Sequence, residues 1–318
     1  MKEFISCDWG TSAFRMRLVK IETNIVAAEV RTENGIASTF KLWQNSKIDR
    51  FSFYKTILSE HVAMLEQQCG YALDNIIIVI SGMASSSIGM IELPYKELPF
   101  STDGTDLLIH IVETSKDFTH KMIIISGVKS ANDVMRGEET MLAGCNAENT
   151  GHAQVFIFPG THSKHIVAKN GMAYDFKTYM TGEIFDLLRN KSILSSSVEE
   201  NNIVGENNLN FINGVMESAG SNLLHSIFYI RTNQLFKKLN NKENYHYLSG
   251  LLIGAELKSL LQHKFSSVTL VSVDALAGLY LQALNALGIN KNLQQKNADD
   301  ALIKGQCSIF MQHKSKIN

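Results

Sequence analysis

The chain contains few of the residues from which covalent or metal cross-links are built. Only four cysteines occur in its 318 residues, namely Cys7, Cys69, Cys145 and Cys307. They lie far apart, with neither a Cys-x-x-Cys pair nor a Cys/His spacing typical of zinc, so no disulfide framework and no structural metal is expected. This cysteine usage is typical of a reducing compartment, and we expect a cytoplasmic location.

Long hydrophobic runs and an excess of one charge are also missing. No apolar stretch approaches the roughly 20 residues that span a bilayer, and the N-terminal MKEFISCDWG lacks the apolar segment of a signal peptide. The 30 Lys and Arg residues balance 31 Asp and Glu residues. Nucleic acids and anionic membranes attract clustered basic residues, so neither is an expected partner. The pattern predicts a soluble protein that holds any anionic ligand by local contacts.

The chain does have enough hydrophobic sequence for two cores. Hydrophobic residues make up 45% of it, and its length exceeds the size at which single cores commonly divide. Apolar segments typical of buried strands, each ending in a turn of small or polar residues, lie at 4–6, 76–81, 122–126 and 155–158. Loops at the carboxyl ends of strands collect ligands in open α/β sheets. We therefore expect these four loops to lie near one cleft.

The surrounding segments predict a two-part α/β organisation. Residues 14–21 and 24–30 flank a short Glu-Thr-Asn link, which predicts an antiparallel meander near the N-terminus. Helical patterns occupy 53–69, 133–145, 182–190, 215–239, 246–262 and 274–287. The polar stretch 146–153 is the best candidate for a linker. The sequence thus predicts an N-terminal lobe over residues 1–149 and a C-terminal lobe over residues 150–318.

The loop after the first strand has the composition of a phosphate-binding turn. In CDWGTSAFRMRLV, Asp8 stands at the strand end and is followed by Gly10, Thr11 and Ser12. Backbone N–H groups and hydroxyls of such a hairpin can face a phosphate, while the carboxylate holds Mg²⁺ through water. The alternative is an ordinary hairpin with an Asx-type turn, because Asp-x-Gly-Ser/Thr is short and common.

A second loop of this kind follows the strand at 155–158. In PGTHSK, Gly160 allows a close approach to an anion. Thr161 and Ser163 offer hydroxyls, and Lys164 adds a cation near developing negative charge. The loop is not a Walker A motif, because the following HIVAKNG is typical of a strand and not of a helix. Two hairpin phosphate loops, one in each predicted lobe, are more specific together than either is alone.

Between the two loops, ANDVMRGEETMLAG carries the candidate catalytic acids. Asn132 and Asp133 are expected to cap a helix whose first turns contain Glu138 and Glu139. A kinase needs a carboxylate there, since the substrate hydroxyl loses its proton as the γ-phosphoryl group arrives. The alternative is a capped surface helix with solvated acids. Arg136 favours the first interpretation, because a planar cation suits a carboxylate substrate.

Taken in order, these motifs resemble the 2-dehydro-3-deoxygalactonokinases, sugar-acid kinases of the hexokinase and actin-like superfamily. The matching segments run along nearly the whole chain: DWGTS (8–12) with Arg15, ISGM (80–83) with ELPY (92–95), NDVMRGEET (132–140), PGTHSK (159–164), MTGEIFDLL (180–188), SIFYIRTNQL (226–235) and YLSGLLIGAEL (247–257). The resemblance implies an α/β chain with two actin-like, ribonuclease H-like lobes and an active-site cleft between them. It also implies ATP with Mg²⁺, and transfer of the γ-phosphoryl group to the 6-hydroxyl of 2-dehydro-3-deoxy-D-galactonate.

The resemblance further assigns roles to particular residues. Glu138 is the first choice of catalytic base, with Glu139 and Asp133 in reserve. Asp8 is the expected metal and phosphate anchor, and Lys164 completes the catalytic set. The expected ATP contacts are Asp8, Gly10, Thr11, Ser12, Gly160, Thr161, His162 and Ser163. The expected substrate contacts are Arg15, Ser81, Gly82, Met83, Glu92, Tyr95, Arg136 and Glu183.

Several positions depart from the family pattern. Where the family tends to read Ile-Gly-Ser-Arg-Gln-Gly-Trp, residues 84–90 read ASSSIGM, so an Arg, a Gln and a Trp expected to face the sugar acid are missing. Ser126, Lys129 and Ser272 stand where Pro, Arg and Gly are usual. Two alternatives therefore stay open: a kinase of another sugar acid, or a catalytically silent relative that binds a sugar acid or nucleotide. The oligomeric state also stays open, with a homodimer as one form.

Overall fold

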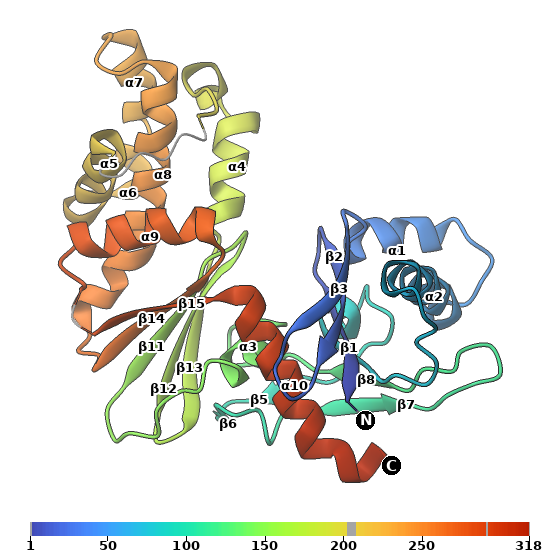
Figure 1. The fold of residues 1–318 in the computed structure, drawn as a ribbon. Coiled ribbons are helices and arrows are strands. Elements are labelled where there is room, and N and C mark those ends of the chain that lie inside the picture. Colours follow the sequence, from blue (N-terminus) through green and yellow to red (C-terminus); the bar gives the residue numbers. More distant parts are fainter. Residues whose placement is uncertain (1, 202–207, 291, 318) are drawn as a thin grey trace. The chain divides into compact units, whose positions relative to one another are not determined.

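The computed structural model describes residues 2–201, 208–290 and 292–317, which divide into two compact units (Figure 1). The first unit comprises Met1–Asn149, Asn170–Asp175 and Ala298–Asn318, and the second comprises Thr150–Lys169 and Phe176–Asn297. The helix that begins at Ala298 was expected in the C-terminal lobe, whereas it packs in the first unit. An amphipathic pattern shows that a helix covers a core but not which core, so this segment could not be placed from sequence.

The first unit is built on a six-stranded sheet with the order β3-β2-β1-β4-β8-β7. Its strands are β1 (Glu3–Trp9), β2 (Phe14–Lys20), β3 (Val26–Thr32), β4 (Ile78–Gly82), β7 (Ile109–Val112) and β8 (Met122–Ile125). Strands β1, β2 and β3 pair antiparallel in chain order, which confirms the predicted meander. Strand β4 runs parallel to both β1 and β8. Three of the four predicted strand-end loops therefore lie at one edge of this sheet.

Helices α1 (Ile36–Gln44), α2 (Arg50–Cys69), α3 (Glu138–Ala143) and α10 (Ala298–Ile317) belong to the same unit. The short strands β5 (Lys96–Glu97), β9 (Val128–Lys129) and β10 (Val134–Met135) form a separate three-stranded sheet. Helix α2 begins where the Asp49 carboxylate accepts a hydrogen bond from the Ser52 N–H at 3.0 Å. It ends at Gly70, whose φ of 76° favours glycine. Its buried side chains, which include Tyr54 and Leu58, join the apolar core of the unit.

The segment before α3 differs from the helix predicted over 133–145. Val134 and Met135 form β10, and Gly137 follows with a φ of 111° before α3 begins at Glu138. Asp133 therefore does not cap a helix; its Oδ1 accepts a hydrogen bond from the Val134 N–H at 2.8 Å. The prediction was wrong because the positive φ of Gly137 separates the preceding strand from α3, so the helix begins only at Glu138. Apolar spacing does not show such a break.

The second unit is built on a mixed sheet, whose strands in this unit have the order β15-β14-β11-β12-β13. Its strands are β11 (Gln154–Phe158), β12 (Ser163–Lys169), β13 (Met172–Tyr179), β14 (Ser267–Ser272) and β15 (Leu293–Asn297). Strands β11 and β12 form the antiparallel hairpin predicted for the PGTHSK loop, while β11, β14 and β15 run parallel. The first residues of β13, Met172 and Ala173, belong to the first unit and pair there with β6 (Phe100–Ser101).

The helices of the second unit are α4 (Thr181–Lys191), α5 (Leu209–Gly220), α6 (Leu223–Ser226), α7 (Tyr229–Leu235), α8 (Asn241–Leu257) and α9 (Asp274–Ala286). Most of α8 is buried, as its apolar sequence predicts. It packs closely on α5, where a Cβ on Gly250 would lie only 2.0 Å from the Phe211 carbonyl oxygen. The prediction of a single helix over 215–239 was wrong, because two short helices follow α5 there. Asn222 caps the start of α6, and Phe228 precedes α7.

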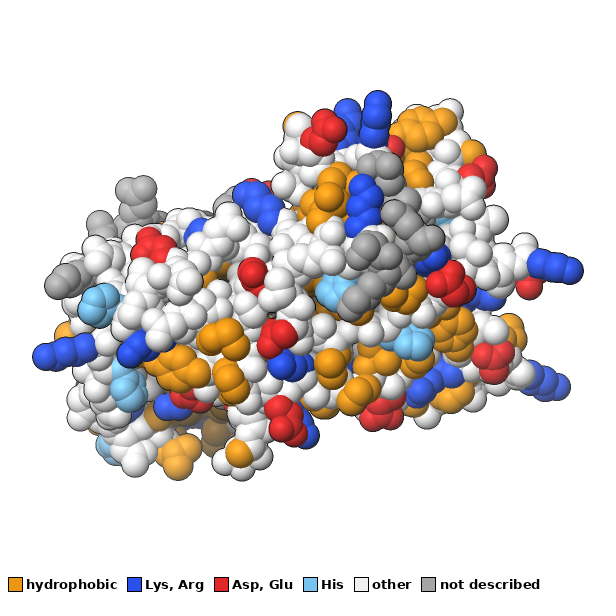
Figure 2. All heavy atoms as spheres, turned by 90° about the horizontal axis from the view of Figure 1, so that it is seen from below, with side chains coloured by type: hydrophobic (Ala, Val, Ile, Leu, Met, Phe, Trp, Pro, Cys, Tyr) orange, Lys and Arg blue, Asp and Glu red, His pale blue; other side chains and the backbone are white. Residues whose placement is uncertain are grey.

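The surface carries mixed charges. On the face drawn in Figure 2, acidic and basic side chains are interspersed and do not gather into a patch of one sign. Within residues 2–201, 208–290 and 292–317, no helix has the length and apolar character needed to cross a membrane.

Candidate active site

Asp8 lies near the end of β1, between two other strands. It stands opposite Arg15 on β2 and beside Ser81 on β4. The Arg15 guanidinium is 3.8 Å from the Asp8 carboxylate, which keeps 22% of its side-chain surface exposed. The turn after β4 comes very close, since a Cβ on Gly82 would lie 2.8 Å from the Trp9 carbonyl oxygen and 3.5 Å from Asp8 Oδ1. Asp8, Arg15, Ser81 and Gly82 are therefore brought together, as predicted from their motifs.

Charged side chains of both signs surround Asp8. Burial raises the pKa of Asp8, and the carboxylates of Asp299 and Glu138 act in the same direction. The guanidinium groups of Arg15 and Arg17 oppose this rise. Arg15 is held mainly by Asp299, at 2.5 Å, which sequence reasoning missed because the two residues are far apart in the chain. A largely buried carboxylate with this many charged neighbours is typical of a functional site.

The Gly-Thr-Ser turn after β1 is held by hydrogen bonds of its own. The Gly10 N–H donates to the Ala13 carbonyl at 2.9 Å, which closes the hairpin. The carbonyls of Gly10 and Thr11 accept hydrogen bonds from the first residues of α1. The side chains of Thr11 and Ser12 are exposed and can reach a ligand. This turn can thus offer its hydroxyls to an anion, whereas the Gly10 N–H is already used.

The two acids at the start of α3 have different surroundings. Glu139 is buried, and both of its oxygens accept a hydrogen bond from the Gly137 N–H, at 2.9 and 2.8 Å. Burial, followed by the charge of Glu138, raises the pKa of Glu139 to about 7. Glu138 is only partly buried and is close enough to Asp8 to raise its pKa. Of the two acids, Glu138 is the one with access to a substrate.

Gly137 places α3 beside the strand-end residues. A Cβ on Gly137 would lie 3.6 Å from the Cα of Gly82, so the two glycine backbones are in contact. The start of α3 therefore lies next to Gly82 and, through it, next to Asp8. Asp133, the other reserve base, lies in the turn between β9 and β10 and outside α3.

Arg136 is tied to the loop whose sequence departs from the family pattern. Its Nη1 donates to Ser85 Oγ at 2.7 Å, and its Nη2 donates to the Leu93 carbonyl at 3.4 Å. Its guanidinium lies over the Tyr95 ring, 4.0 Å from the ring centre. Arg136 and Tyr95 are thus brought together, and Arg136 has contacts that hold the loop in place. The sequence predicted a substrate contact for Arg136 but not these contacts with the loop.

Three further positions around this loop, of which Met83 and Glu92 were predicted to contact the substrate, lie in different environments. Met83 begins a short 3-10 helix (Met83–Ser85) directly after β4, and Glu92 is exposed. Met90, which stands where the family pattern has Trp, is 1% exposed and belongs to the apolar core of the first unit. In this chain the position of the family tryptophan is therefore part of the core. This burial could not be predicted, because a core methionine and an exposed one look alike in a sequence.

In the second unit, some residues of the β11–β12 turn that were predicted to bind ATP are buried. Ser163 is fully buried, and its hydroxyl lies 3.0 Å from the Tyr280 hydroxyl and 3.4 Å from the Gly160 N–H. Lys164 is 5% exposed, and its Nζ donates to the His162 carbonyl at 3.1 Å. Thr161 and His162 are exposed. The outward-facing groups of this loop are therefore Thr161 and His162.

Helix α4 begins against the same loop. A Cβ on Gly182 would lie 2.7 Å from the Gly160 carbonyl oxygen, and the Glu183 N–H donates to the Thr161 carbonyl at 3.0 Å. The Glu183 carboxylate is hydrogen-bonded to the His162 ring. Glu183 was expected to contact the substrate, whereas the structure pairs it with the exposed histidine of the second loop.

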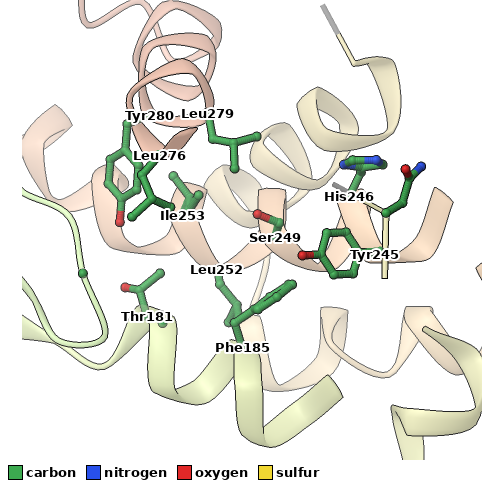
Figure 3. Close-up of a pocket in the computed structure, with 13 residues that line it drawn as sticks. Thr181, Phe185, Tyr245, His246, Ser249, Leu252, Ile253, Leu276, Leu279 and Tyr280 are labelled. Carbon is green, nitrogen blue, oxygen red and sulfur yellow. The ribbon is translucent and has the colours of Figure 1, made fainter. Parts of the chain in front are cut away.

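A cavity of about 310 Å³ opens beside this loop within the second unit (Figure 3). Its lining comes from α4, α8 and α9 and is mostly apolar: Phe185, Leu252, Ile253, Leu276 and Leu279, with the polar groups of Thr181, Ser249 and Tyr280. Gly160 of the loop contributes to the wall. Walls of this kind suit a flat, largely apolar ring with a few polar atoms. The apolar sequence of α8 indicated burial, but not that a cavity lies at its side.

The model of one enzyme family matches most of the chain. The description of that family is 2-keto-3-deoxy-galactonokinase, and the match covers residues 8–309. The chain belongs to the 2-keto-3-deoxy-galactonokinase family. A protein of Rhizobium meliloti named as a probable 2-dehydro-3-deoxygalactonokinase is 30% identical over 95% of this chain and 94% of its own length. The 2-dehydro-3-deoxygalactonokinase of Escherichia coli is 32% identical over 66% of this chain and 71% of its own length.

Solved structures of family members and more distant proteins show the fold. The crystal structure of a protein from Sinorhizobium meliloti named as a putative 2-dehydro-3-deoxygalactonokinase has a TM-score of 0.82 and 29% identity, and the match covers 96% of this chain and 95% of that one. The activator of 2-hydroxyisocaproyl-CoA dehydratase from Clostridium difficile has a TM-score of 0.50 at 12% identity, with coverage of 99% and 96%. These relatives confirm the predicted actin-like ATPase fold. The family resemblance read from the motifs is confirmed as well.

Proposed function

We propose that this chain transfers the γ-phosphoryl group of ATP to the 6-hydroxyl of 2-dehydro-3-deoxy-D-galactonate, a step of galactonate catabolism. Family membership over residues 8–309 supports a carbohydrate kinase. The observation that carries the chemistry is the position of Glu138, partly exposed in the first turn of α3 and next to the Gly82 turn beside Asp8. In this proposal, the first phosphate loop and the catalytic helix lie within 1–149, and the second phosphate loop and the nucleoside site lie within 150–318.

Glu138 is the proposed general base. The substrate hydroxyl becomes more acidic as its oxygen bonds to phosphorus, and a nearby carboxylate can accept the proton. Glu139 is unsuited to this role, because it is buried and both of its oxygens are held by the Gly137 N–H. Arg15 and Arg136 are the proposed cations for the substrate carboxylate and the transferring phosphate. Weaker candidates for contacts to the sugar hydroxyls are Glu92, Tyr95 and Glu183, and the remaining proposed substrate contacts are Ser81, Gly82 and Met83.

The proposed nucleotide site combines the cavity and the loop at its wall. The cavity of about 310 Å³ would take the purine, because its apolar lining suits a flat ring. Thr161 and His162 face outward from the loop and would contact the phosphates. Gly160 and Ser163 would act indirectly, since they are hydrogen-bonded to each other. Lys164 would support the loop through the His162 carbonyl.

Asp8 is the proposed anchor for Mg²⁺. No group of three or more His, Cys, Asp and Glu side chains suited to a metal occurs within the described ranges. A single carboxylate fits Mg²⁺, which keeps several waters and is otherwise held by nucleotide phosphates. The ion would neutralise phosphate charge during transfer. Thr11 and Ser12, whose hydroxyls are exposed in the adjacent turn, would contact a phosphate.

We propose a cytoplasmic location, because four scattered cysteines without a pairing pattern are typical of a protein in a reducing compartment. The expected partners are these two small molecules, without nucleic acid or membrane. A homodimer is one proposed assembly, and sedimentation velocity over a range of protein concentrations would distinguish it from a monomer.

A coupled ADP-release assay tests the proposed activity. ATP with Mg²⁺ is offered with 2-dehydro-3-deoxy-D-galactonate, with its gluconate epimer and with galactonate, and one control contains no sugar. Turnover on the first compound alone is the expected result. Preference for another acid would show that the 84–90 loop has changed the substrate. ATP binding without sugar-dependent release would show a catalytically silent relative.

A further inference from the structure

A buried carboxylate beneath the second loop joins four elements of the second unit. Glu256, near the end of α8, is 2% exposed. Its Oε2 accepts hydrogen bonds from Thr181 Oγ1 at 2.5 Å and from Tyr280 Oη at 2.7 Å. Its Oε1 accepts one from His165 Nε2 at 2.9 Å. These donors come from the first residue of α4, from α9 and from β12. A buried charge is tolerated only when it is hydrogen-bonded in this way.

The carboxylate sets the direction of the whole chain of hydrogen bonds. Because an ionised Glu256 can only accept, the Tyr280 hydroxyl must donate to it. Tyr280 Oη is then left as an acceptor, so Ser163 Oγ donates to it across 3.0 Å. The remaining lone pairs of Ser163 Oγ face the Gly160 N–H at 3.4 Å. Burial, followed by the charge of Glu256, raises the pKa of Tyr280 far above its ordinary value, so its proton stays in place.

These hydrogen bonds connect Glu256 to the β11–β12 turn and to the start of α4. Through Tyr280 and Ser163 it fixes the inner side of the β11–β12 turn, which leaves Thr161 and His162 facing outward. Through Thr181 it fixes the start of α4, whose next residues, Gly182 and Glu183, pack on the same turn. Thr181 and Tyr280 also line the cavity (Figure 3).

We infer that Glu256 is a positioning residue for nucleotide binding, which holds the 159–163 turn and the start of α4 against the cavity through Tyr280 and Thr181. The inference rests on the proposed function in that the ligand of the loop and cavity is ATP. Glu256 itself does not contact the ligand. Its loss therefore acts on the affinity for ATP, while the affinity for the sugar acid stays unchanged.

Direct ATP binding is the decisive measurement, because it does not depend on which sugar acid is the substrate. Isothermal titration of the full chain with ATP and Mg²⁺ is carried out for the natural protein and for Tyr280→Phe, Thr181→Val and Glu256→Ala. Each variant removes hydrogen bonds of a buried charged group, so we expect its Kd for ATP to rise by about tenfold or more. The KM for the sugar acid in the ADP-release assay should stay within about twofold, and kcat should fall less than the ATP affinity.

Glu256→Gln provides the conservative variant. The glutamine carbonyl can still accept from Thr181 and Tyr280, and its amide can donate to His165 Nε2 if the imidazole proton moves to Nδ1, which is buried without a partner among the described residues. We expect ATP binding close to that of the natural protein. Tyr179→Phe is the matched control, because it removes a hydroxyl near the same histidine: Tyr179 lies against the His165 ring and is hydrogen-bonded to the Ser259 hydroxyl.

The outcomes separate this inference from the proposed function. If Tyr280→Phe and Thr181→Val bind ATP as the natural protein does, Glu256 is a purely structural residue and the inference is wrong. Glu256→Gln as weak as Glu256→Ala would also contradict it, because acceptor geometry would then not matter. ATP binding that weakens as expected, in a protein without sugar-dependent ADP release, would support the inference and overturn the kinase activity. Absence of ATP binding by the natural protein would overturn both.

Discussion

Gly137 and Gly82 are in backbone contact, and a Cβ on Gly137 would lie 3.6 Å from the Gly82 Cα. This contact brings the start of α3, with Glu138, beside the end of β4 and the Asp8 carboxylate. Gly137 also has a φ of 111°, a backbone conformation that residues with a Cβ rarely adopt. The position of the proposed base therefore depends on a glycine just before it.

Gly137→Ala should lower both activity and stability. The strained φ is expected to cost about 1–2 kcal/mol of the free energy of unfolding, and α3 must shift to relieve it. Gly70→Ala is the matched control, because Gly70 has a φ of 76° with open space around it, at the end of α2. Urea unfolding should show a similar loss for both variants, while ADP release should fall only for Gly137→Ala. Equal activity in the two would mean that Gly137 does not position the base.

Glu138→Gln should abolish most turnover without unfolding the protein. Loss of a general base lowers kcat by about 10²–10⁴-fold, whereas Glu138 is only partly buried and its amide analogue has the same shape. The ADP-release assay measures kcat, and titration with ATP and Mg²⁺ should give an unchanged Kd. Glu139→Gln is the companion variant and should retain much more activity. Unchanged turnover in Glu138→Gln would move the base to another residue.

The strands and loops of the fold followed from local sequence. Apolar runs such as 155–158 and 122–126 correspond to β11 and β8, and the return strand after PGTHSK is β12. Such runs are informative because burial on both faces of a sheet requires continuous apolar residues. The order of the strands and the place of α10 were not readable, since they depend on which segments meet in space.

The site shows the same division between local and distant information. The family resemblance assigned Asp8, Gly82 and Glu138 to the site, and the structure brings these residues together. The choice between Glu138 and Glu139 depends on the rotation of α3, which Gly137 sets. The inward direction of Ser163 depends on Tyr280, a residue of another helix. Neither could be deduced from the motif itself.

The stability of the protein should change with pH because of Glu139. Burial, followed by the charge of Glu138, raises the pKa of Glu139 from 4.5 to about 7. A folded-state pKa above the unfolded one means that the neutral form favours folding. This stabilisation is complete below the unfolded value of 4.5 and is lost as the pH rises through about 7. It amounts to about 3 kcal/mol, from 1.36 kcal/mol per pKa unit.

Glu139→Gln should remove this pH dependence. Relative to the natural protein, the variant should gain unfolding free energy as the pH rises from about 4.5 to about 8, because the amide does not ionise. Urea unfolding at several pH values measures the difference. Glu113→Gln, which changes an exposed acid paired with Lys121, is the control and should give a profile parallel to that of the natural protein. A parallel profile for Glu139→Gln would show that Glu139 does not titrate in this range.

Arg136→Lys should weaken the use of the sugar acid although the charge is kept. The guanidinium spans Ser85 Oγ, at 2.7 Å, and the Tyr95 ring, at 4.0 Å, and an ammonium group cannot make both contacts with one planar face. The 84–93 loop should then shift, so the KM for the sugar acid should rise by about tenfold with ATP affinity unchanged. Ser85→Ala, which removes one of these contacts and keeps Arg136, should raise the same KM by a smaller factor. The KM values of the two variants, measured side by side, decide between two roles of Arg136. If Ser85→Ala has no effect on this KM while Arg136→Lys raises it, Arg136 acts on the substrate itself and not through the loop.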